Sequence, residues 1–304
     1  MDKHGVRLPT AVIAVGNQKG GVAKTTNTVH MAAALGELGR KCLIIDLDMN
    51  QGATRHLGVP SEAFLGAYEM LIGEEEPEDV VITGDDEGVD LPTSVHLISA
   101  RRNLEKVDQA LLQENKFLIT QDVLIDPIKK LDGKYDYVFL DTAPNATTPT
   151  IAAYKAARWF LLSALPDPLA ISGLTDALMD ISAARRHGNP GLQILGVVLS
   201  GIDGRRTRLA TNLINYVEEK FSIDGGPSAK FKTTISRSTV VPEAQKLGKT
   251  LFQTEPAHKV AQQYRALVRE IEERVGRVPL AATEPTVEAA PVEVLTEQEA
   301  VANG

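Results

Sequence analysis

The chain has 304 residues, of which 43% are hydrophobic and 24% are charged, so it is long enough to bury a full core without disulfides or structural metals. A single cysteine, Cys42, excludes an intramolecular disulfide framework and any thiolate cluster supplied by one chain. The net charge of −8 argues, on its own, against a nucleic-acid partner. The chain has no run of about 18 apolar residues, the length that a membrane-spanning helix needs. The segment before Ala11 lacks an apolar leader, so we expect a cytoplasmic protein.

The predicted elements begin after this segment and alternate in type. Short apolar, β-branched runs are separated by helical patterns, which is typical of βαβ units around a parallel sheet. Buried strands are predicted over 11–16, 42–46, 95–99, 137–141, 159–164 and 194–200. Helices are predicted over 25–38, 170–187 and 208–221, and an apolar stripe at helical spacing covers 260–275. The fold class is therefore α/β, with a mainly parallel, twisted sheet and helices on both faces.

The composition changes at residue 277. From there to residue 304 the chain is rich in Ala, Val, Pro, Thr and Glu, a composition typical of a disordered tail. Five glutamates and Arg277 give this tail a net charge of −4, so the body carries the remaining −4 of the total −8. We predict one domain over 1–276 and a disordered acidic tail over 277–304.

The first strand runs directly into a glycine-rich segment that ends in Lys-Thr and precedes a helix. A strand, a glycine-rich loop, Lys-Thr and a helix in that order predict a phosphate-binding loop. Glycines let backbone N–H groups turn toward phosphate oxygens, and the positive end of the helix dipole points at them. The lysine supplies a charge to the β and γ phosphates, and the first threonine can ligate Mg²⁺. The expected binding residues are Gly20, Gly21, Val22, Ala23, Lys24, Thr25 and Thr26.

Two features of this loop depart from the common pattern. Ala23 replaces the glycine expected just before Lys24, at little cost if φ is negative at that position. A second lysine, Lys19, opens the motif.

Carboxylates follow two of the predicted strands. Asp46 and Asp48 are two residues apart, so on a strand they point to the same side, at the carboxyl end where open α/β sheets bind ligands. Asp141 ends the strand over 137–141, which is how a carboxylate reaches the metal in a phosphate-loop site. The sequence therefore predicts a metal-bound phosphate and an attacking water near these three residues.

The loop from Lys19 to Thr26 resembles the deviant Walker A motif of the ParA/MinD family of P-loop ATPases, and Asn17-Gln18 before it is similar to ParA in particular. The segment over 46–54 is similar to the family's Asp-x-Asp-Pro-Gln-Gly-Asn element, with Met49-Asn50 in place of Pro-Gln. The segment starting at Asp141 resembles Asp-x-Pro-Pro, with Ala143 in place of the first proline.

The resemblance implies a P-loop NTPase fold, ATP and Mg²⁺ as ligands, and specific roles. Lys19 would reach across a nucleotide-sandwich homodimer to the phosphates bound by the other subunit. Asp48 would position the hydrolytic water. Asp46 would support Mg²⁺ through water, beside Thr25 and Asp141.

Two later segments, over 199–209 and 234–244, also resemble ParA segments. ParA dimers bind DNA without sequence preference through basic surfaces in these regions, and a dimer doubles the phosphates contacted. The resemblance implies DNA-binding roles for Arg205, Arg206, Arg208 and Arg237. This weakens the exclusion of nucleic acid drawn from the net charge alone.

The expected protein is an ATPase that partitions a plasmid or chromosome. By the resemblance it dimerises on ATP, associates with the nucleoid and is released on hydrolysis stimulated by a ParB-type centromere-binding or cargo-adaptor protein. Two alternatives stay open: a ParA-like ATPase that positions a protein cargo or organelle, and a MinD-like ATPase of the membrane surface. The acidic, proline-punctuated tail argues against the basic amphipathic helix that ends MinD, so no membrane partner is expected.

Overall fold

The computed structural model describes residues 8–113, 121–202, 207–223 and 226–277. Its centre is one sheet of six strands in the order β3-β2-β4-β1-β5-β6, and every neighbouring pair of strands is parallel. The strands are β1 (Ala11–Gly16), β2 (Cys42–Leu47), β3 (Val95–Ile98), β4 (Tyr137–Thr142), β5 (Trp159–Ala164) and β6 (Gln193–Leu199). All six predicted strands are present, each within one residue of its predicted ends.

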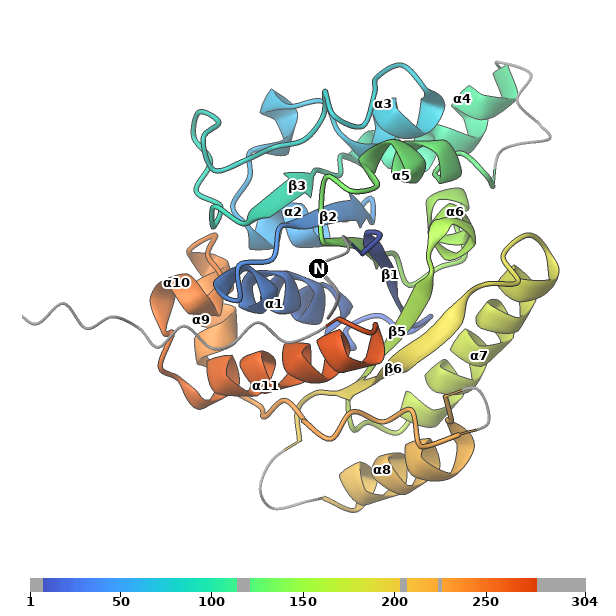
Figure 1. Cartoon of the computed structure of the whole chain (residues 1–304), viewed down its shortest axis with the longest axis vertical. Helices are drawn as coiled ribbons and strands as arrows, with labels where there is room; N and C mark the ends of the chain where they lie inside the picture. The colour runs from blue at the N-terminus through green and yellow to red at the C-terminus, as the bar shows by residue number, and fades with distance from the viewer. Residues whose placement is uncertain (1–7, 114–120, 203–206, 224–225, 278–304) are drawn as a thin grey trace, which may run out of the picture.

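Helices cover both faces of this sheet (Figure 1). They are α1 (Lys24–Glu37), α2 (Gly52–His56), α3 (Ala67–Ile72), α4 (Val107–Gln113), α5 (Ile125–Leu131), α6 (Thr148–Ala156), α7 (Ala170–Arg186), α8 (Arg208–Lys220), α9 (Val240–Lys246), α10 (Leu251–Thr254) and α11 (Lys259–Arg274). The predicted fold class is confirmed. Within the described residues, no helix is both long enough and apolar enough to span a membrane.

The two faces of the sheet hold two separate apolar cores. On β1, Ile13 and Val15 pack with the helices α1 and α11, whereas Val12 and Ala14 face the core that contains α3 to α8. Successive residues of a strand point to opposite faces, so a strand that is covered on both sides must be apolar at every position. This is why β1 reads as an unbroken apolar run, and why its ends could be predicted from sequence.

The central position of β1 decides where a ligand can bind. β1 lies between β4 and β5, so the loop that leaves its carboxyl end is flanked by the ends of two other strands. In the register of the sheet, Val15 is paired with Asp141 of β4, and Asp141 is in turn paired with Asp46 of β2. Ligands of open α/β sheets bind outside this edge.

The described residues end at Arg277, which is also the first residue of the predicted tail. Its side chain is 4% exposed, and its guanidinium donates to the Asp136 carboxylate and to the carbonyl oxygen of Pro9. Packing of the body therefore includes Arg277. Residues 278–304, the rest of the predicted tail, lie outside the described residues.

Candidate nucleotide-binding site

The loop between β1 and α1 forms one wall of a cavity. Gly21 has a φ of 72°, a conformation that favours glycine, and a Cβ added to Gly20 or Gly21 would meet nothing within 4 Å, so both face open space. The cavity has a volume of 420 Å³ and is lined by Gly20, Gly21, Val22, Ala23, Lys24, Thr25, Thr26, Asp48, Asn50 and Pro144. The structure thus brings the seven predicted loop residues and Asp48 together around one space at the N-terminus of α1.

Strand β5 holds this loop in place through hydrogen bonds of two buried side chains, Asn17 of the loop and Ser163 of β5. The Asn17 amide nitrogen donates to the carbonyl oxygen of Ser163 at 2.9 Å, while the Asn17 amide oxygen accepts from the backbone N–H of Lys19 at 2.9 Å. The Ser163 hydroxyl donates to the carbonyl oxygen of Val22 at 2.6 Å. Sequence reasoning used Asn17 only as part of a family signature and missed Ser163, which lies inside a predicted strand and carries no local signal.

Lys24 occupies the centre of the loop. Its ammonium group donates to the carbonyl oxygens of Asn17, at 3.0 Å, and Lys19, at 3.1 Å. Burial lowers the pKa of Lys24, and the charges of Asp141 and Asp48 oppose that shift. The two carbonyl oxygens therefore hold the charge in place at the cavity wall, where a phosphate oxygen can replace them.

Asp46 and Asp141 form a pair of fully buried carboxylates on neighbouring strands. Asp141 accepts a hydrogen bond of 2.7 Å from the Thr25 hydroxyl, and Asp46 accepts from the backbone N–H and the hydroxyl of Thr54. Burial raises the pKa of both carboxyls, and the charge of Asp46 raises the pKa of Asp141 further. Two carboxylates this close favour a cation beside them.

Asp48 lies directly after the end of β2, is half-buried and lines the cavity. One of its carboxylate oxygens accepts from both the backbone N–H and the side-chain amide of Asn50, each at 2.9 Å. The departure at Met49-Asn50 from the family's Pro-Gln thus gives Asp48 a hydrogen-bonding partner within its own turn. Gly52 is the first residue of α2. A Cβ at this position would lie 2.7 Å from the Thr25 hydroxyl, so only glycine lets α2 approach Thr25 this closely.

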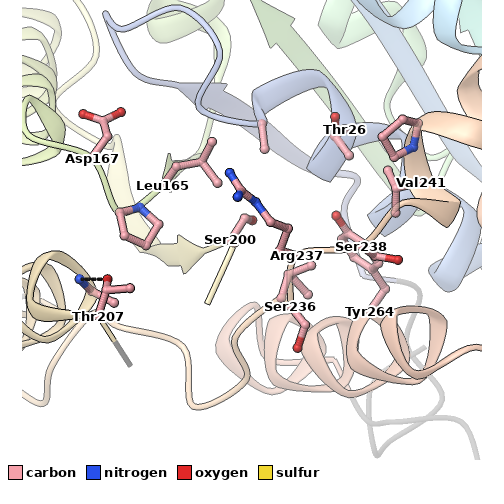
Figure 2. Close-up of a pocket in the computed structure, with 16 residues that line it drawn as sticks. Thr26, Leu165, Asp167, Ser200, Thr207, Ser236, Arg237, Ser238, Val241 and Tyr264 are labelled. Carbon is pink, nitrogen blue, oxygen red and sulfur yellow. Dashed lines mark hydrogen bonds between the residues drawn. The ribbon is translucent and has the colours of Figure 1, made fainter. Parts of the chain in front are cut away.

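A second cavity, of 460 Å³, shares the lining residues Ala23 and Thr26 with the first and is also lined by Val241 and Pro242 of α9 (Figure 2). Leu165 and Pro166, Ser200 and Gly201, and the segment around Ser236 also line it. Figure 2 shows Arg237 extending into this cavity toward Leu165. Sequence reasoning did not identify this space, because its walls come from segments far apart in the chain.

The structure describes two of the four predicted DNA-binding arginines, and Thr207, the residue before Arg208, lines the same cavity as Arg237. Arg208 is exposed at the start of α8, and Arg237 is an exposed residue at the edge of the second cavity. Arg205 and Arg206 lie outside the described residues.

The site fits a magnesium nucleotide. Mg²⁺ prefers oxygen ligands and keeps several waters and phosphate oxygens, so it needs few protein groups. The Thr25 hydroxyl and the carboxylates of Asp141 and Asp46 supply such oxygens beside the phosphate loop. Among the described residues no group of three or more His, Cys, Asp or Glu could hold a metal ion. The cavity at the loop provides room for phosphates, and the second cavity adjoins it at Ala23 and Thr26.

Comparison with known proteins gives the same class. The family described as AAA domain matches residues 10–194. The chromosome-partitioning ATPase Soj of Thermus thermophilus is 33% identical over 270 residues, which cover 89% of this chain and 98% of that protein. A crystal structure of cobyrinic acid a,c-diamide synthase from Mycobacterium smegmatis, with bound ADP and magnesium, is 27% identical with a TM-score of 0.71, covering 91% of this chain and 100% of that one. The septum site-determining protein MinD of Pyrococcus horikoshii, complexed with Mg-ADP, is 24% identical with a TM-score of 0.68, covering 88% and 98% of the two chains, and shows the fold alone.

Fold and loop together define a P-loop ATPase that binds ATP and Mg²⁺. Within that class, the chain belongs to the ParA family of partition ATPases, in the ParA/MinD superfamily.

Ala23 is strained in this loop, which leads to a stability prediction. Its φ is 66°, so the negative φ that would make alanine inexpensive is not present. A left-handed alanine costs about 1 kcal/mol relative to glycine. We predict that Ala23→Gly raises the free energy of unfolding of the nucleotide-free protein by about 0.5 to 1 kcal/mol, measured by urea denaturation.

Ala33→Gly, in the interior of α1, is the matched control and is expected to lower the free energy of unfolding by about 1 kcal/mol. A destabilised Ala23→Gly protein would contradict the strain at this position.

The paired carboxylates predict a pH dependence of stability. Because burial raises the folded-state pKa of Asp46 and Asp141 above the ordinary value of about 4, the folded protein binds these protons more tightly than the unfolded chain. This contribution to stability is present below about pH 4 and is lost as the pH rises through the raised values. Asp141→Asn removes one of the two ionisations, so it should reduce the loss of unfolding free energy between about pH 5 and about pH 8.

Urea denaturation of the nucleotide-free protein at several pH values measures this slope. Asp126→Asn, which removes an exposed carboxylate on α5, serves as the control for net charge. Equal slopes for wild type and Asp141→Asn would contradict the raised pKa values.

Proposed function

We propose that the protein is a DNA-partition ATPase whose ATP-bound form is a sandwich homodimer that binds DNA without sequence preference. The observation that carries the proposal is the separation of the two loop lysines. Lys24 lines the phosphate cavity of its own chain, whereas Lys19 does not line it and is held elsewhere, by Asp167. A charged lysine at the loop that does not serve its own cavity fits a role at the phosphates of a second copy.

Within one protomer the described residues divide the chemistry among them. Lys24 and the loop amides bind phosphate oxygens and bring their charge to the reacting group. Thr25, Asp141 and Asp46 would hold Mg²⁺, which supplies charge neutralisation when bound. Asp48, at the cavity wall and fixed by Asn50, orients the attacking water.

The second cavity fits the nucleoside. It adjoins the phosphate loop at Ala23 and Thr26, and its apolar walls at Leu165 and Pro166 suit the face of a base. Ser200 and Ser236 offer hydroxyl groups, the few polar contacts that orient a ligand in such a cavity. Arg237 is better placed to contact this ligand than a distant DNA surface, so its predicted DNA role is the weaker of two proposals for this residue.

Partition of DNA is favoured over the alternatives by the relatives. The 33% identical Soj of Thermus thermophilus is a chromosome-partitioning ATPase, and it aligns over nearly its whole length. We therefore propose DNA and a ParB-type centromere-binding protein as partners, and association with the nucleoid in the ATP-bound state. Exposed Arg208, with Arg205 and Arg206 beside it in sequence, would contact phosphates. A role in positioning a protein cargo uses the same dimer and surface, and a MinD-like role would require binding to lipid instead.

Co-sedimentation tests this function directly. The full-length protein is mixed with non-specific DNA or with anionic liposomes, each in the presence of ATP or ADP. We predict ATP-dependent pelleting with DNA only, weakened steeply by salt because phosphate contacts release counterions. Asp48→Ala should keep the protein on DNA after ATP addition, and Lys19→Ala should remove dimerisation and DNA binding together.

ATP-dependent pelleting with liposomes alone would favour the MinD-like alternative and overturn the proposal. A Lys19→Ala protein that is fully dimeric with ATP would overturn the role of Lys19 at a partner's phosphates.

A further inference from the structure

Lys19 forms an ion pair with Asp167, which lies three residues before the start of α7. The Lys19 ammonium donates to one carboxylate oxygen of Asp167, and the two side chains are 26% and 30% exposed. Asp167 lines the second cavity, and Figure 2 shows it at one side of that cavity, across from Ser238. The pair is therefore open to solvent, so that Lys19 can leave Asp167 without any unfolding of the core.

Asp167 is itself held in a fixed position. Its other carboxylate oxygen accepts from the backbone N–H of Leu169 at 2.8 Å, and its carbonyl oxygen accepts from the backbone N–H of Ala170 at 3.2 Å. One oxygen thus closes a turn at Leu169, the residue before α7, while the other faces Lys19. The carboxylate is a rigid anion, and the lysine is the partner that moves.

Helix α7 approaches the loop closely along this contact. A Cβ on Gly173 would lie 2.8 Å from the Asn17 amide oxygen and 3.4 Å from Cβ of Lys19, so a larger residue would push the loop away from α7. About two turns further along α7 from Gly173, the Gln18 amide donates to both carboxylate oxygens of Asp180, at 2.8 and 2.9 Å. Three consecutive residues, Asn17 to Lys19, are therefore docked on β5 and α7, away from the phosphate cavity.

We infer that Asp167 is a positioning residue, which holds Lys19 outside the phosphate cavity of its own chain and releases it only to a second copy that carries nucleotide. This inference rests on the proposed sandwich dimer. Lys19 exchanges one anion for another: it leaves a single carboxylate for the more highly charged phosphates of the facing copy. In the absence of such phosphates the exchange brings no gain, so the ion pair opposes association of nucleotide-free protomers.

Asp167→Asn tests this role, because asparagine keeps the oxygen that accepts from Leu169 and loses the charge that holds Lys19. The matched control is Asp180→Asn, which changes net charge by the same amount on the same helix and contacts Gln18 in place of Lys19. Sedimentation velocity with a saturating non-hydrolysable ATP analogue gives the dimer dissociation constant of each full-length protein. We expect Asp167→Asn to dimerise about two- to five-fold more tightly than wild type, the size expected for a partly exposed ion pair, and Asp180→Asn to match wild type.

Thermal unfolding of the nucleotide-free protein supplies the second readout. The effects of Asp167→Asn and Lys19→Gln should be non-additive in the double variant, whereas Asp180→Asn and Lys19→Gln should add. A merely structural role for Asp167 would give weaker dimerisation of Asp167→Asn, and additive effects on stability would contradict an ion pair between Asp167 and Lys19.

Each outcome decides between the two levels of the proposal. If wild type dimerises on the analogue but Asp167→Asn is equal to or weaker than wild type, the positioning role is overturned and the sandwich dimer stands. If wild type and all variants remain monomeric with the analogue, the proposed dimer is overturned and the positioning role with it.

Discussion

The burial of two carboxylates beside a phosphate loop is the constraint on which the rest of this structure depends. Asp46 and Asp141 are fully buried and lie side by side on β2 and β4, so their charges are unfavourable unless cations and donors surround them. The protein supplies Lys24, the Thr25 hydroxyl and the Thr54 hydroxyl, and Mg²⁺ would complete the balance when nucleotide is bound. In the strand order, β4 lies between β2 and the strand that leads into the loop, which places Asp141 between Asp46 and the loop.

At the same edge of the sheet, two lysines of the loop interact with different carboxylates: Lys24 with those at the phosphate cavity and Lys19 with Asp167. Lys24 lies at the phosphate cavity, where the buried carboxylates offset its desolvation. Lys19 lies on the opposite side of the loop, where Asp167 neutralises it and Asn17 fixes its backbone. The two lysines are five residues apart, and in the nucleotide-free chain only Lys24 lies at the phosphate cavity. This division fits the proposed dimer, in which one loop would serve two sites.

The sheet and the phosphate loop could be predicted from sequence because their determinants are local. A strand such as β1 is buried on both faces and so is apolar throughout, and the loop is specified by a run of eight residues. The supports of the loop could not be predicted in this way. Ser163 and Asp167 are about 150 residues away along the chain from the groups that they hold, and neither belongs to a periodic pattern. The positive φ of Ala23 also escaped prediction, since the sequence alone does not say which residue of the loop makes the turn into α1.

Subunit mixing tests the central claim, that each complete site takes Lys19 from one copy and Asp48 from the other. Lys19→Ala and Asp48→Ala proteins are mixed before ATP is added, and hydrolysis is measured with DNA present. In a mixed dimer, one site has an intact Asp48 with the loop that binds the nucleotide and an intact Lys19 from the facing copy. The account predicts activity where each variant alone has none. The rate should be at most about a quarter of the wild-type rate, because a mixed dimer has one complete site and, lacking one Lys19, forms no more readily than a dimer of Asp48→Ala chains. A mixture no more active than the sum of its parts would contradict it.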